Sequence, residues 1–223
     1  MTILLATNNA HKKRELAETF PDNTVLTPED VGVAYEYDET GITFFENSYG
    51  KARGLWAFLH GETLPGVTAS RVAPERQLAN LTVIADDSGI VVPALGGPGV
   101  YSARYGRDAG VATDAERTLH LLSQLGGSTE REAYYVCCMV AVYGENRFAV
   151  VQEQWDGVVA EAPSDGKGGF GYDPVFFLAE FGCTAADISS EQKHAISHRG
   201  KAARAIARAL NGIAPLDSSP KRA

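Results

Sequence analysis

Residues 81–89 read Leu-Thr-Val-Ile-Ala-Asp-Asp-Ser-Gly, an apolar run followed by two adjacent carboxylates and a pair of turn-forming residues. The run up to Ala85 predicts a buried strand, and Asp-Asp-Ser-Gly is favourable turn chemistry, so we expect the strand to end there. Carboxylates buried without a partner are costly, and a hydrated Mg²⁺ that also binds substrate phosphates would offset this cost. Because side chains alternate along a strand, Asp86 and Asp87 should point in different directions. A surface turn and a metal-binding strand end both remain open.

A second apolar run, Ile3 to Ala6, begins the sequence and is followed by Thr7-Asn8-Asn9. This pattern predicts a buried strand that ends in a turn. The charged segment from His11 to Phe20 then predicts a helix. Free N–H groups at a helix N-terminus attract anions, so the turn is a candidate phosphate site.

Further helices are predicted from helical spacing and capping residues. The clearest begins near Thr43, and its apolar stripe consists of Phe45, Tyr49, Ala52, Trp56 and Leu59. Thr113-Asp114-Ala115-Glu116 is a capping box that opens a second helix, with Leu119, Leu122 and Leu125 expected inside. Ser197 caps a last helix that ends near Gly212.

The remaining segments predict strands and loops. Runs 134–143 and 147–159 are rich in β-formers and flank Gly144-Glu145-Asn146, which indicates a long antiparallel hairpin. Residues 61–80 and the glycine-rich 166–174 are expected to be loops. Strands and helices together predict an α/β fold in one domain over residues 1–223, with 215–223 as a flexible tail.

Three segments could carry binding chemistry. Thr43-Phe44-Phe45-Glu46 fits a capping box, so Glu46 either satisfies a backbone N–H or binds metal. Lys51 lies four residues after Asn47 on one helix face and could meet a phosphate. In Gly168-Gly169-Phe170-Gly171-Tyr172-Asp173-Pro174, two aromatics share one side of an extended chain, where a ring could stack on a purine or pack inside a turn.

A fourth candidate segment is the start of the last helix, Ser197-His198-Arg199-Gly200-Lys201, with Lys193 just before it. His and Arg side chains there could donate to base carbonyls or phosphates. Cations at a helix N-terminus oppose the helix dipole. This mismatch favours a binding function over a solvated basic surface.

Composition narrows the function classes. The 223 residues are 44% hydrophobic and 22% charged, as in a globular protein with a core. No apolar run reaches the roughly 18 residues of a membrane span, and no signal peptide is evident, so we expect a cytoplasmic protein. A net charge of −8 argues against nucleic-acid binding. The cysteines Cys137, Cys138 and Cys183 show no zinc spacing and are expected to be buried thiols.

Taken together, these segments resemble the inosine/xanthosine triphosphate pyrophosphatase family of house-cleaning enzymes. The matching stretches are Leu-Ala-Thr-Asn-Asn-Ala-His-Lys (5–12), Thr-Gly-Ile-Thr-Phe-Phe-Glu-Asn (40–47), Lys-Ala-Arg (51–53), Ala-Asp-Asp-Ser-Gly (85–89), Gly-Val-Tyr-Ser-Ala-Arg-Tyr (99–105), Phe-Gly-Tyr-Asp-Pro (170–174) and Ile-Ser-His-Arg-Gly (196–200). They occur in order along nearly the whole chain, from Ile3 to about Ala205.

The resemblance implies an elongated mixed sheet flanked by helices, two lobes around a central cleft, and a homodimer. It implies hydrolysis of ITP, dITP and XTP to the monophosphate and pyrophosphate with Mg²⁺. Glu46 and Asp87 would bind the metal, and Asp87 would also accept a proton, with Asp86 as a second candidate catalytic residue. Substrate would contact Thr7, Asn8, Asn9, Lys12, Lys51, Ser88, Phe170, Gly171, Tyr172, Asp173, Lys193, His198 and Arg199.

The sequence departs from the family pattern in three places. Asn8 stands where the family usually has glycine, and since Asn tolerates left-handed conformations we expect the turn to survive. The 96–99 segment is one residue shorter than usual, and the 61–80 excursion is longer. Two other functions stay open: a Maf-like pyrophosphatase for other modified nucleotides, and a nucleotide-binding sensor without activity.

Overall fold

The computed structural model describes residues 2–72 and 81–212, so the predicted tail at 215–223 lies outside the described residues. Over these residues one large mixed sheet runs in the order β10-β9-β8-β7-β5-β1-β2, with β6 beside β5, and β3 pairs β4 in a small second sheet. The strands are β1 (Thr2–Leu5), β2 (Thr24–Leu26), β3 (Val33–Tyr37), β4 (Val67–Arg71), β5 (Leu81–Val92), β6 (Gly97–Pro98), β7 (Glu132–Gly144), β8 (Arg147–Val159), β9 (Phe176–Leu178) and β10 (Cys183–Thr184).

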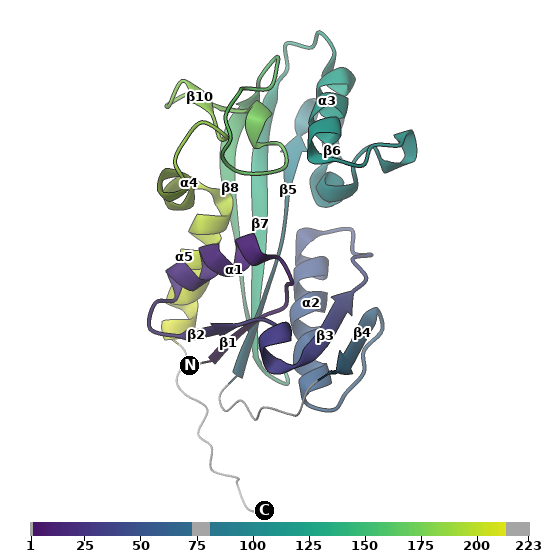
Figure 1. The fold of residues 1–223 in the computed structure, drawn as a ribbon, viewed down its shortest axis with the longest axis vertical. Coiled ribbons are helices and arrows are strands. Elements are labelled where there is room, and N and C mark those ends of the chain that lie inside the picture. The colour runs from purple at the N-terminus through teal and green to yellow at the C-terminus, as the bar shows by residue number, and fades with distance from the viewer. Residues whose placement is uncertain (1, 73–80, 213–223) are drawn as a thin grey trace, which may run out of the picture.

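Helices cover both faces of the large sheet, as expected for this architecture. They are α1 (Ala10–Thr19), α2 (Phe44–Leu59), α3 (Asp114–Leu125), α4 (Ser190–Ile196) and α5 (His198–Asn211), with short 3₁₀ turns at Glu29–Val31, Pro93–Leu95, Gly99–Arg104, Arg107–Ala109 and Asp173–Val175. Strand β1 is parallel to β2 and β5, whereas β5, β7, β8 and β9 each run antiparallel to the next strand in that order. Figure 1 shows the long strands β5, β7 and β8 spanning the molecule, which confirms the predicted elongated mixed sheet.

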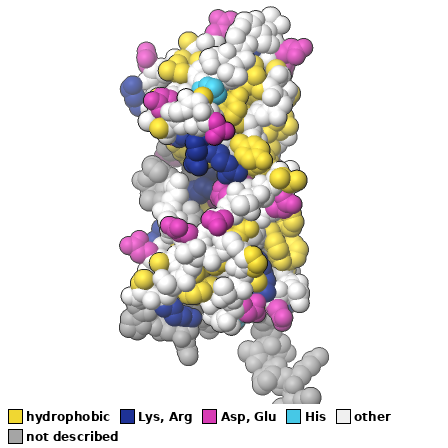
Figure 2. Space-filling view, turned by 90° about the vertical axis from the view of Figure 1, so that its right-hand side faces the viewer, with side chains coloured by type: hydrophobic (Ala, Val, Ile, Leu, Met, Phe, Trp, Pro, Cys, Tyr) yellow, Lys and Arg dark blue, Asp and Glu magenta, His cyan; other side chains and the backbone are white. Residues whose placement is uncertain are grey.

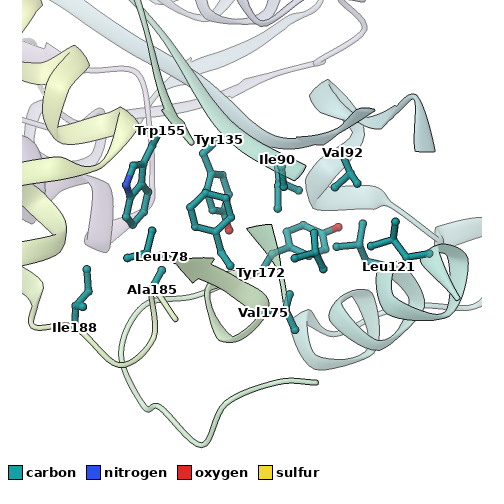
Figure 3. Close-up of a cluster of buried hydrophobic side chains, with 14 residues drawn as sticks. Ile90, Val92, Leu121, Tyr135, Trp155, Tyr172, Val175, Leu178, Ala185 and Ile188 are labelled. Atoms are coloured by element: carbon teal, nitrogen blue, oxygen red, sulfur yellow. The ribbon is translucent and has the colours of Figure 1, made fainter. Parts of the chain in front are cut away.

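The core lies in three clusters around these long strands. Near the first half of β5, one face packs Val83 and Ala85 against α2, while the other packs Ile84 against α1 and α5. The opposite end of the sheet packs Leu121 of α3 and Phe176 of β9 around the ends of β5, β7 and β8 (Figure 3). The molecule therefore has two lobes that share one sheet.

The prediction that the strand beginning at Leu81 ends at Ala85 is wrong. Strand β5 continues to Val92, and its pairing with β7 runs without interruption from Val83 to Val91. The Asp-Asp-Ser-Gly segment is therefore the middle of a buried strand, where basic side chains from distant segments offset the buried carboxylate of Asp86. Gly89 is required there, because a Cβ would lie 2.2 Å from the carbonyl oxygen of Gly99.

The helix boundaries follow the predicted caps. Thr43, Thr113 and Ser197 each accept a hydrogen bond from a backbone N–H in the first turn of the helix that follows. The expected interior of α3 is partly wrong, since Leu119 is 57% exposed and Leu121 is buried in its place. The predicted long hairpin is confirmed as β7 and β8.

The 61–80 excursion contains a strand that the sequence did not predict. Within it, β4 pairs with β3, and this small sheet packs on α2 at two glycines. A Cβ at Gly50 would lie 2.0 Å from the hydroxyl of Tyr37, and one at Gly54 would lie 2.6 Å from Val67. Tyr35 of β3 donates a hydrogen bond of 2.7 Å to the carbonyl oxygen of Lys51, so the small sheet helps to fix this part of α2. Residues 73–80 lie outside the described ranges.

Among the described residues, no helix has both the length and the apolar character needed to cross a membrane. The three cysteines are unpaired; Cys137 and Cys138 are buried as expected, and Cys183 is partly buried. Burial raises the pKa of the Cys138 thiol to about 11, so this thiol is protonated near neutral pH.

Candidate active site

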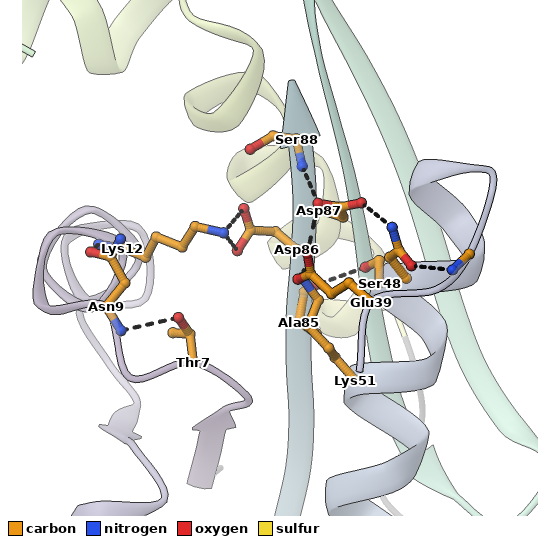
Figure 4. A network of polar contacts seen from close by, with 12 residues as sticks. Thr7, Asn9, Lys12, Glu39, Ser48, Lys51, Ala85, Asp86, Asp87 and Ser88 are labelled. Carbon is orange, nitrogen blue, oxygen red and sulfur yellow. Dashed lines mark hydrogen bonds and ion pairs between the residues drawn. The ribbon is translucent and has the colours of Figure 1, made fainter. Parts of the chain in front are cut away.

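Asp86 and Asp87 project from opposite faces of β5, as strand alternation predicts. On one face, both carboxylate oxygens of Asp86 lie within 2.9 Å of the Lys12 ammonium, and Oδ2 lies 3.4 Å from Nε of Arg199. Figure 4 shows Lys12 reaching across from α1 to this carboxylate. Asp86 thus joins a cation from the first helix to a cation from the last.

The surroundings of Asp86 favour its ionised form. Burial alone would raise the pKa of this carboxyl, but the positive charges of Lys12, Arg199 and Lys51 outweigh burial and hold the pKa well below its usual range. Asp86 is therefore a buried anion with two cationic partners. This is a stable arrangement, but it leaves little tendency to take up a proton.

Asp87 has a different environment. Its Oδ2 accepts a hydrogen bond of 2.9 Å from the side-chain amide of Asn47, and its Oδ1 accepts one of 3.0 Å from the N–H of Ser88. Its ion-pair partner among the described residues is the Lys51 ammonium, 4.0 Å from Oδ1. Burial raises the pKa of Asp87, and Lys51 and Asn47 do not fully compensate. Of the two carboxylates, Asp87 is the one that still lacks a close cation.

Glu39 is a member of this site that the sequence reasoning missed. Its Oε1 lies 2.6 Å from the Lys51 ammonium, and its backbone oxygen accepts a hydrogen bond of 3.3 Å from Arg104. Lys51 Nζ lies 2.6 Å from Glu39 and 4.0 Å from Asp87, so both carboxylates lie near one ammonium (Figure 4). In the sequence Glu39 stands only beside Asp38 and belongs to no recognisable motif, so local spacing did not indicate it.

Glu46 forms the capping box that its sequence pattern allows. Its Oε2 accepts hydrogen bonds from the N–H groups of Ile42 at 2.8 Å and Thr43 at 3.0 Å, and these bonds lower the pKa of this exposed carboxyl. The described residues contain no cluster of three or more His, Cys, Asp or Glu side chains arranged around a cation site. Mg²⁺ needs fewer, since it usually keeps several waters and takes one or two carboxylates.

The Thr7–Lys12 segment forms the predicted turn into α1. The N–H of Asn9 donates to the hydroxyl of Thr7 at 3.2 Å, and Asn9 in turn accepts from the N–H of Lys12 at 3.3 Å. The turn survives Asn8, whose side chain donates a hydrogen bond of 3.2 Å to the carbonyl oxygen of Tyr35. Asn8 and Asn9 are exposed, and this turn lies beside the face of β5 that carries Asp86 (Figure 4).

The glycine-rich segment separates its two aromatics instead of placing them side by side. The ring of Phe170 is 43% exposed, whereas Tyr172 is buried and donates a hydrogen bond of 2.8 Å to the carbonyl oxygen of Ser102. The positive φ of +64° at Gly171 breaks the extended geometry on which the shared side depended. Asp173 is buried; it accepts from the N–H of Phe170 and pairs with the ammonium of Lys193.

The start of α5 is buried, not solvated. Arg199 donates a hydrogen bond of 2.8 Å to the hydroxyl of Ser88 besides its contact with Asp86. The ring of His198 stacks on Tyr135, with centroids 4.7 Å apart. Its Nδ1 is one of two buried side-chain polar atoms in the described part of the chain without a hydrogen-bond partner. Burial, with the charges of Arg199 and Lys193, lowers the pKa of His198 well below its usual value, so its imidazole is neutral.

These side chains surround a cavity of about 150 Å³. It is smaller than the roughly 300–1,000 Å³ of pockets that enclose a drug-sized ligand, so it suits one flat ring and not a whole nucleotide. The predicted residues that line it are Ser88, Phe170, Gly171, Tyr172, Asp173, Lys193, His198 and Arg199. Figure 2 shows basic side chains gathered in a hollow at mid-height of the molecule, with acidic side chains below them.

One wall of this cavity was not predicted. Asp114 and Arg117, in the first turns of α3, line it together with Ser102 and Ala103. The sequence showed Asp114 only as part of a capping box, and nothing in the spacing of α3 indicates that its first turn faces a cavity.

Known proteins resemble this chain along most of its length. The model of the Ham1 family matches residues 3–209. A dITP/XTP pyrophosphatase of Treponema denticola is 44% identical over 214 residues, which cover 95% of this chain and 100% of the relative.

Solved structures agree with this relationship. A HAM1 protein of Coxiella burnetii has a TM-score of 0.78 and 33% identity, covering 96% of this chain and 100% of that one. A nucleoside-triphosphatase / dITP/XTP pyrophosphatase of Mycobacterium abscessus has a TM-score of 0.66 and 35% identity, with the same coverage. This chain belongs to the Ham1 family.

Proposed function

We propose that residues 1–223 form one catalytic domain that hydrolyses deaminated purine nucleoside triphosphates, ITP, dITP and XTP, to the monophosphate and pyrophosphate in the cytoplasm. One observation carries the proposal. Along the central strand β5, one face carries the poorly compensated carboxylate Asp87 near Lys51. On the other face Asp86 contacts Lys12 and Arg199, and Arg199 also lines a cavity the size of one ring. The names of the relatives support the same substrates.

The geometry supports a division of labour among the side chains. The phosphates extend from the ring cavity toward Lys12 and Lys51, whose charges offset theirs. Asp87 orients a water for attack on the α-phosphorus and takes its proton, a role suited to a carboxyl whose pKa is raised. A bond forms between the water oxygen and the α-phosphorus, the bond to the bridging oxygen breaks, and pyrophosphate leaves.

Mg²⁺ fits this site because Asp87 is a buried carboxylate without a close cation. A bound Mg²⁺ would supply charge neutralisation for the phosphates. Asp87 and Glu39 both lie within 4.0 Å of the Lys51 ammonium, so we propose that these two carboxylates would hold Mg²⁺. The resemblance gives Glu46 in place of Glu39; one of its oxygens, Oε2, accepts hydrogen bonds at the start of α2, and Glu46 stays the alternative ligand.

Two substitutions separate these candidates. Glu39→Gln is expected to raise the Mg²⁺ concentration for half-maximal activity by at least about tenfold, since one anionic ligand is lost. Glu46→Gln should shift it little, because glutamine also serves in a capping box. Mg²⁺ titrations of pyrophosphate release measure both. If Glu46→Gln raises the Mg²⁺ concentration for half-maximal activity more than Glu39→Gln does, Glu46 and not Glu39 is the metal ligand.

Pyrophosphate release from ITP, XTP, dITP, GTP and ATP, with and without Mg²⁺, tests the function itself. Donors at His198 and Arg199 suit the 6-oxo group of hypoxanthine and xanthine and would leave adenine unpaired, so ATP should be the poorest substrate. Preference for modified pyrimidine nucleotides would support the Maf-like alternative. Binding of ITP without any release would support a sensor.

We also propose that the chain forms a homodimer through an apolar face formed by Ile42, Phe45, Tyr101, Phe148 and Val150. Each of these side chains is exposed, and Ile42 is 75% exposed. Tyr49 connects two of them, with its ring centroid 5.5 Å from that of Phe45 and 5.1 Å from that of Phe148. Monomeric proteins rarely leave a large contiguous apolar patch in water.

The oligomeric state checks this proposal. In light scattering coupled to gel filtration, the wild-type protein should have the mass of two chains, and Phe148→Glu should have the mass of one. Phe181→Glu is the matched control, because Phe181 is also exposed but follows β9. A monomeric wild-type protein, or a dimer that survives Phe148→Glu, would rule out this interface.

A further inference from the structure

Arg117 is the one cation that α3 contributes to the ring cavity, on a wall separate from the cations of α4 and α5. Its Nη1 donates a hydrogen bond of 3.1 Å to the carbonyl oxygen of Ala112, and its Nη2 contacts Oδ1 of Asp114. Its side chain is 17% exposed. A guanidinium has five N–H groups in a fixed planar fork, so these two contacts orient it and leave further donors for a ligand.

The position of Arg117 is tied to the exposed ring of Phe170. The N–H of Gly171 donates to Oδ2 of Asp114 at 3.0 Å, and the carbonyl oxygen of Gly171 accepts from the hydroxyl of Thr118 at 3.3 Å. Both polar groups of Gly171 are thus held by the first turns of α3. These two bonds tie the Phe170 loop to α3, and Phe170 and Arg117 line the same cavity.

The 6-position of a purine would not allow this site to distinguish guanine from hypoxanthine and xanthine. Guanine, hypoxanthine and xanthine all carry a 6-oxo group, so donors such as His198 and Arg199 treat the three alike. They differ at position 2, where xanthine has an oxo acceptor, hypoxanthine a C–H and guanine an amino donor. Discrimination needs a polar group that meets this second position.

We propose that Arg117 determines the choice at position 2 of the purine, favouring the 2-oxo group of xanthine over the 2-amino group of guanine. This rests on the proposed function. With the 6-oxo group toward His198 and Arg199, the 2-substituent lies further along the same edge of the ring, and α3 forms the other wall of the cavity. Guanidinium N–H groups bond an oxo group, whereas they face an amino group donor to donor and leave both unpaired.

Asp114 is the one carboxylate on this wall that could instead accept from the guanine amino group. Both of its oxygens are already engaged, Oδ1 by Arg117 and Oδ2 by the N–H of Gly171. Its contacts therefore favour a role in holding Arg117 and the Phe170 loop. This leaves the arginine as the group on α3 that meets the base.

The test compares kcat/KM for XTP, ITP and GTP in the wild-type protein, in Arg117→Met and in the matched control Arg147→Met. Arg147 begins β8, and its guanidinium lies over the ring of Tyr143. In Arg117→Met the XTP-to-ITP ratio should fall about tenfold to hundredfold, as for one lost charge-assisted hydrogen bond, and the GTP-to-ITP ratio should rise. A merely structural role would lower all three substrates alike and leave both ratios within twofold of the wild type.

Two further measurements keep the outcome decisive. Arg117→Gln, which retains an amide donor, replaces Arg117→Met if thermal unfolding shows that the latter does not fold. Affinities for XMP, IMP and GMP, measured by calorimetry, give the same ratios without turnover. If the wild-type protein releases no pyrophosphate from ITP, the proposed function fails, and the XMP-to-GMP ratio still decides the role of Arg117. The contrary outcome in Arg117→Met is a GTP-to-ITP ratio of kcat/KM that falls while the XTP-to-ITP ratio stays as in the wild type. In that case Asp114 and not Arg117 recognises position 2, and the proposal is overturned.

Discussion

Replacing Asp87 with asparagine is expected to lower kcat for ITP by about a thousandfold or more and to leave the protein folded. The amide has the shape of the carboxyl but cannot accept the proton of the attacking water, and a positioned base typically contributes 10²- to 10⁴-fold. The same change removes an anionic ligand from the Mg²⁺ site proposed here. Loss of the base and loss of the Mg²⁺ ligand both slow the attack of water on the α-phosphorus. We therefore expect a decrease in kcat near the upper end of the range of about 10²- to 10⁴-fold.

Stability should move in the opposite direction to activity in this variant. Burial raises the pKa of Asp87, so its ionised form is held in the native state at a cost, and a neutral amide removes this cost. The free energy of unfolding at pH 7 should therefore be equal to or above that of the wild type, measured without Mg²⁺. Asp30→Asn is the control for activity, since Asp30 is a surface carboxylate paired with Lys13. A kcat within tenfold of the wild type would remove Asp87 from the reaction.

The parts of the fold that depend on neighbouring residues could be predicted from the sequence. Thr43 and Thr113 cap their helices through contacts three residues away, and the hairpin of β7 and β8 follows from two β-rich runs around one short turn. Such contacts need no knowledge of the rest of the chain. The boundary of β5 could not be predicted in this way, because the cations that offset Asp86 lie 74 and 113 residues away in sequence.

In the candidate site, too, residues in local sequence patterns could be predicted, and residues brought in by distant packing could not. The residue types expected to meet phosphates and base do gather around β5, because each segment carries a recognisable local pattern. Glu39 and Arg117 were missed, since neither belongs to a pattern and each enters the site only through the packing of β3 and α3. The single φ value of +64° at Gly171 decides that Phe170 is exposed while Tyr172 is buried, and spacing alone does not reveal such a value.

Asp86→Asn should show the reverse profile to Asp87→Asn, with its main effect on stability. Lys12 and Arg199 would lose their shared anion inside the protein, and breaking a buried ion pair from one side typically costs about 3–5 kcal/mol. Urea unfolding at pH 7 measures this loss. The double variant Asp86→Asn with Lys12→Met should recover part of it, because one of the two unpaired cations is then gone.

The pH dependence of this loss distinguishes an ionised Asp86 from a carboxyl that merely fills space. Its folded pKa lies below the unfolded value of about 3.9, so its contribution is fully present above that value and disappears as the pH falls toward the folded pKa. The stability difference between the wild type and Asp86→Asn should therefore be constant between pH 6 and 8 and shrink below about pH 4. A difference that stays constant down to the acid limit of folding would mean that shape and hydrogen bonding, not charge, make Asp86 necessary. In that case the ion pairs of Asp86 with Lys12 and Arg199 would not explain why a carboxylate occupies the centre of β5.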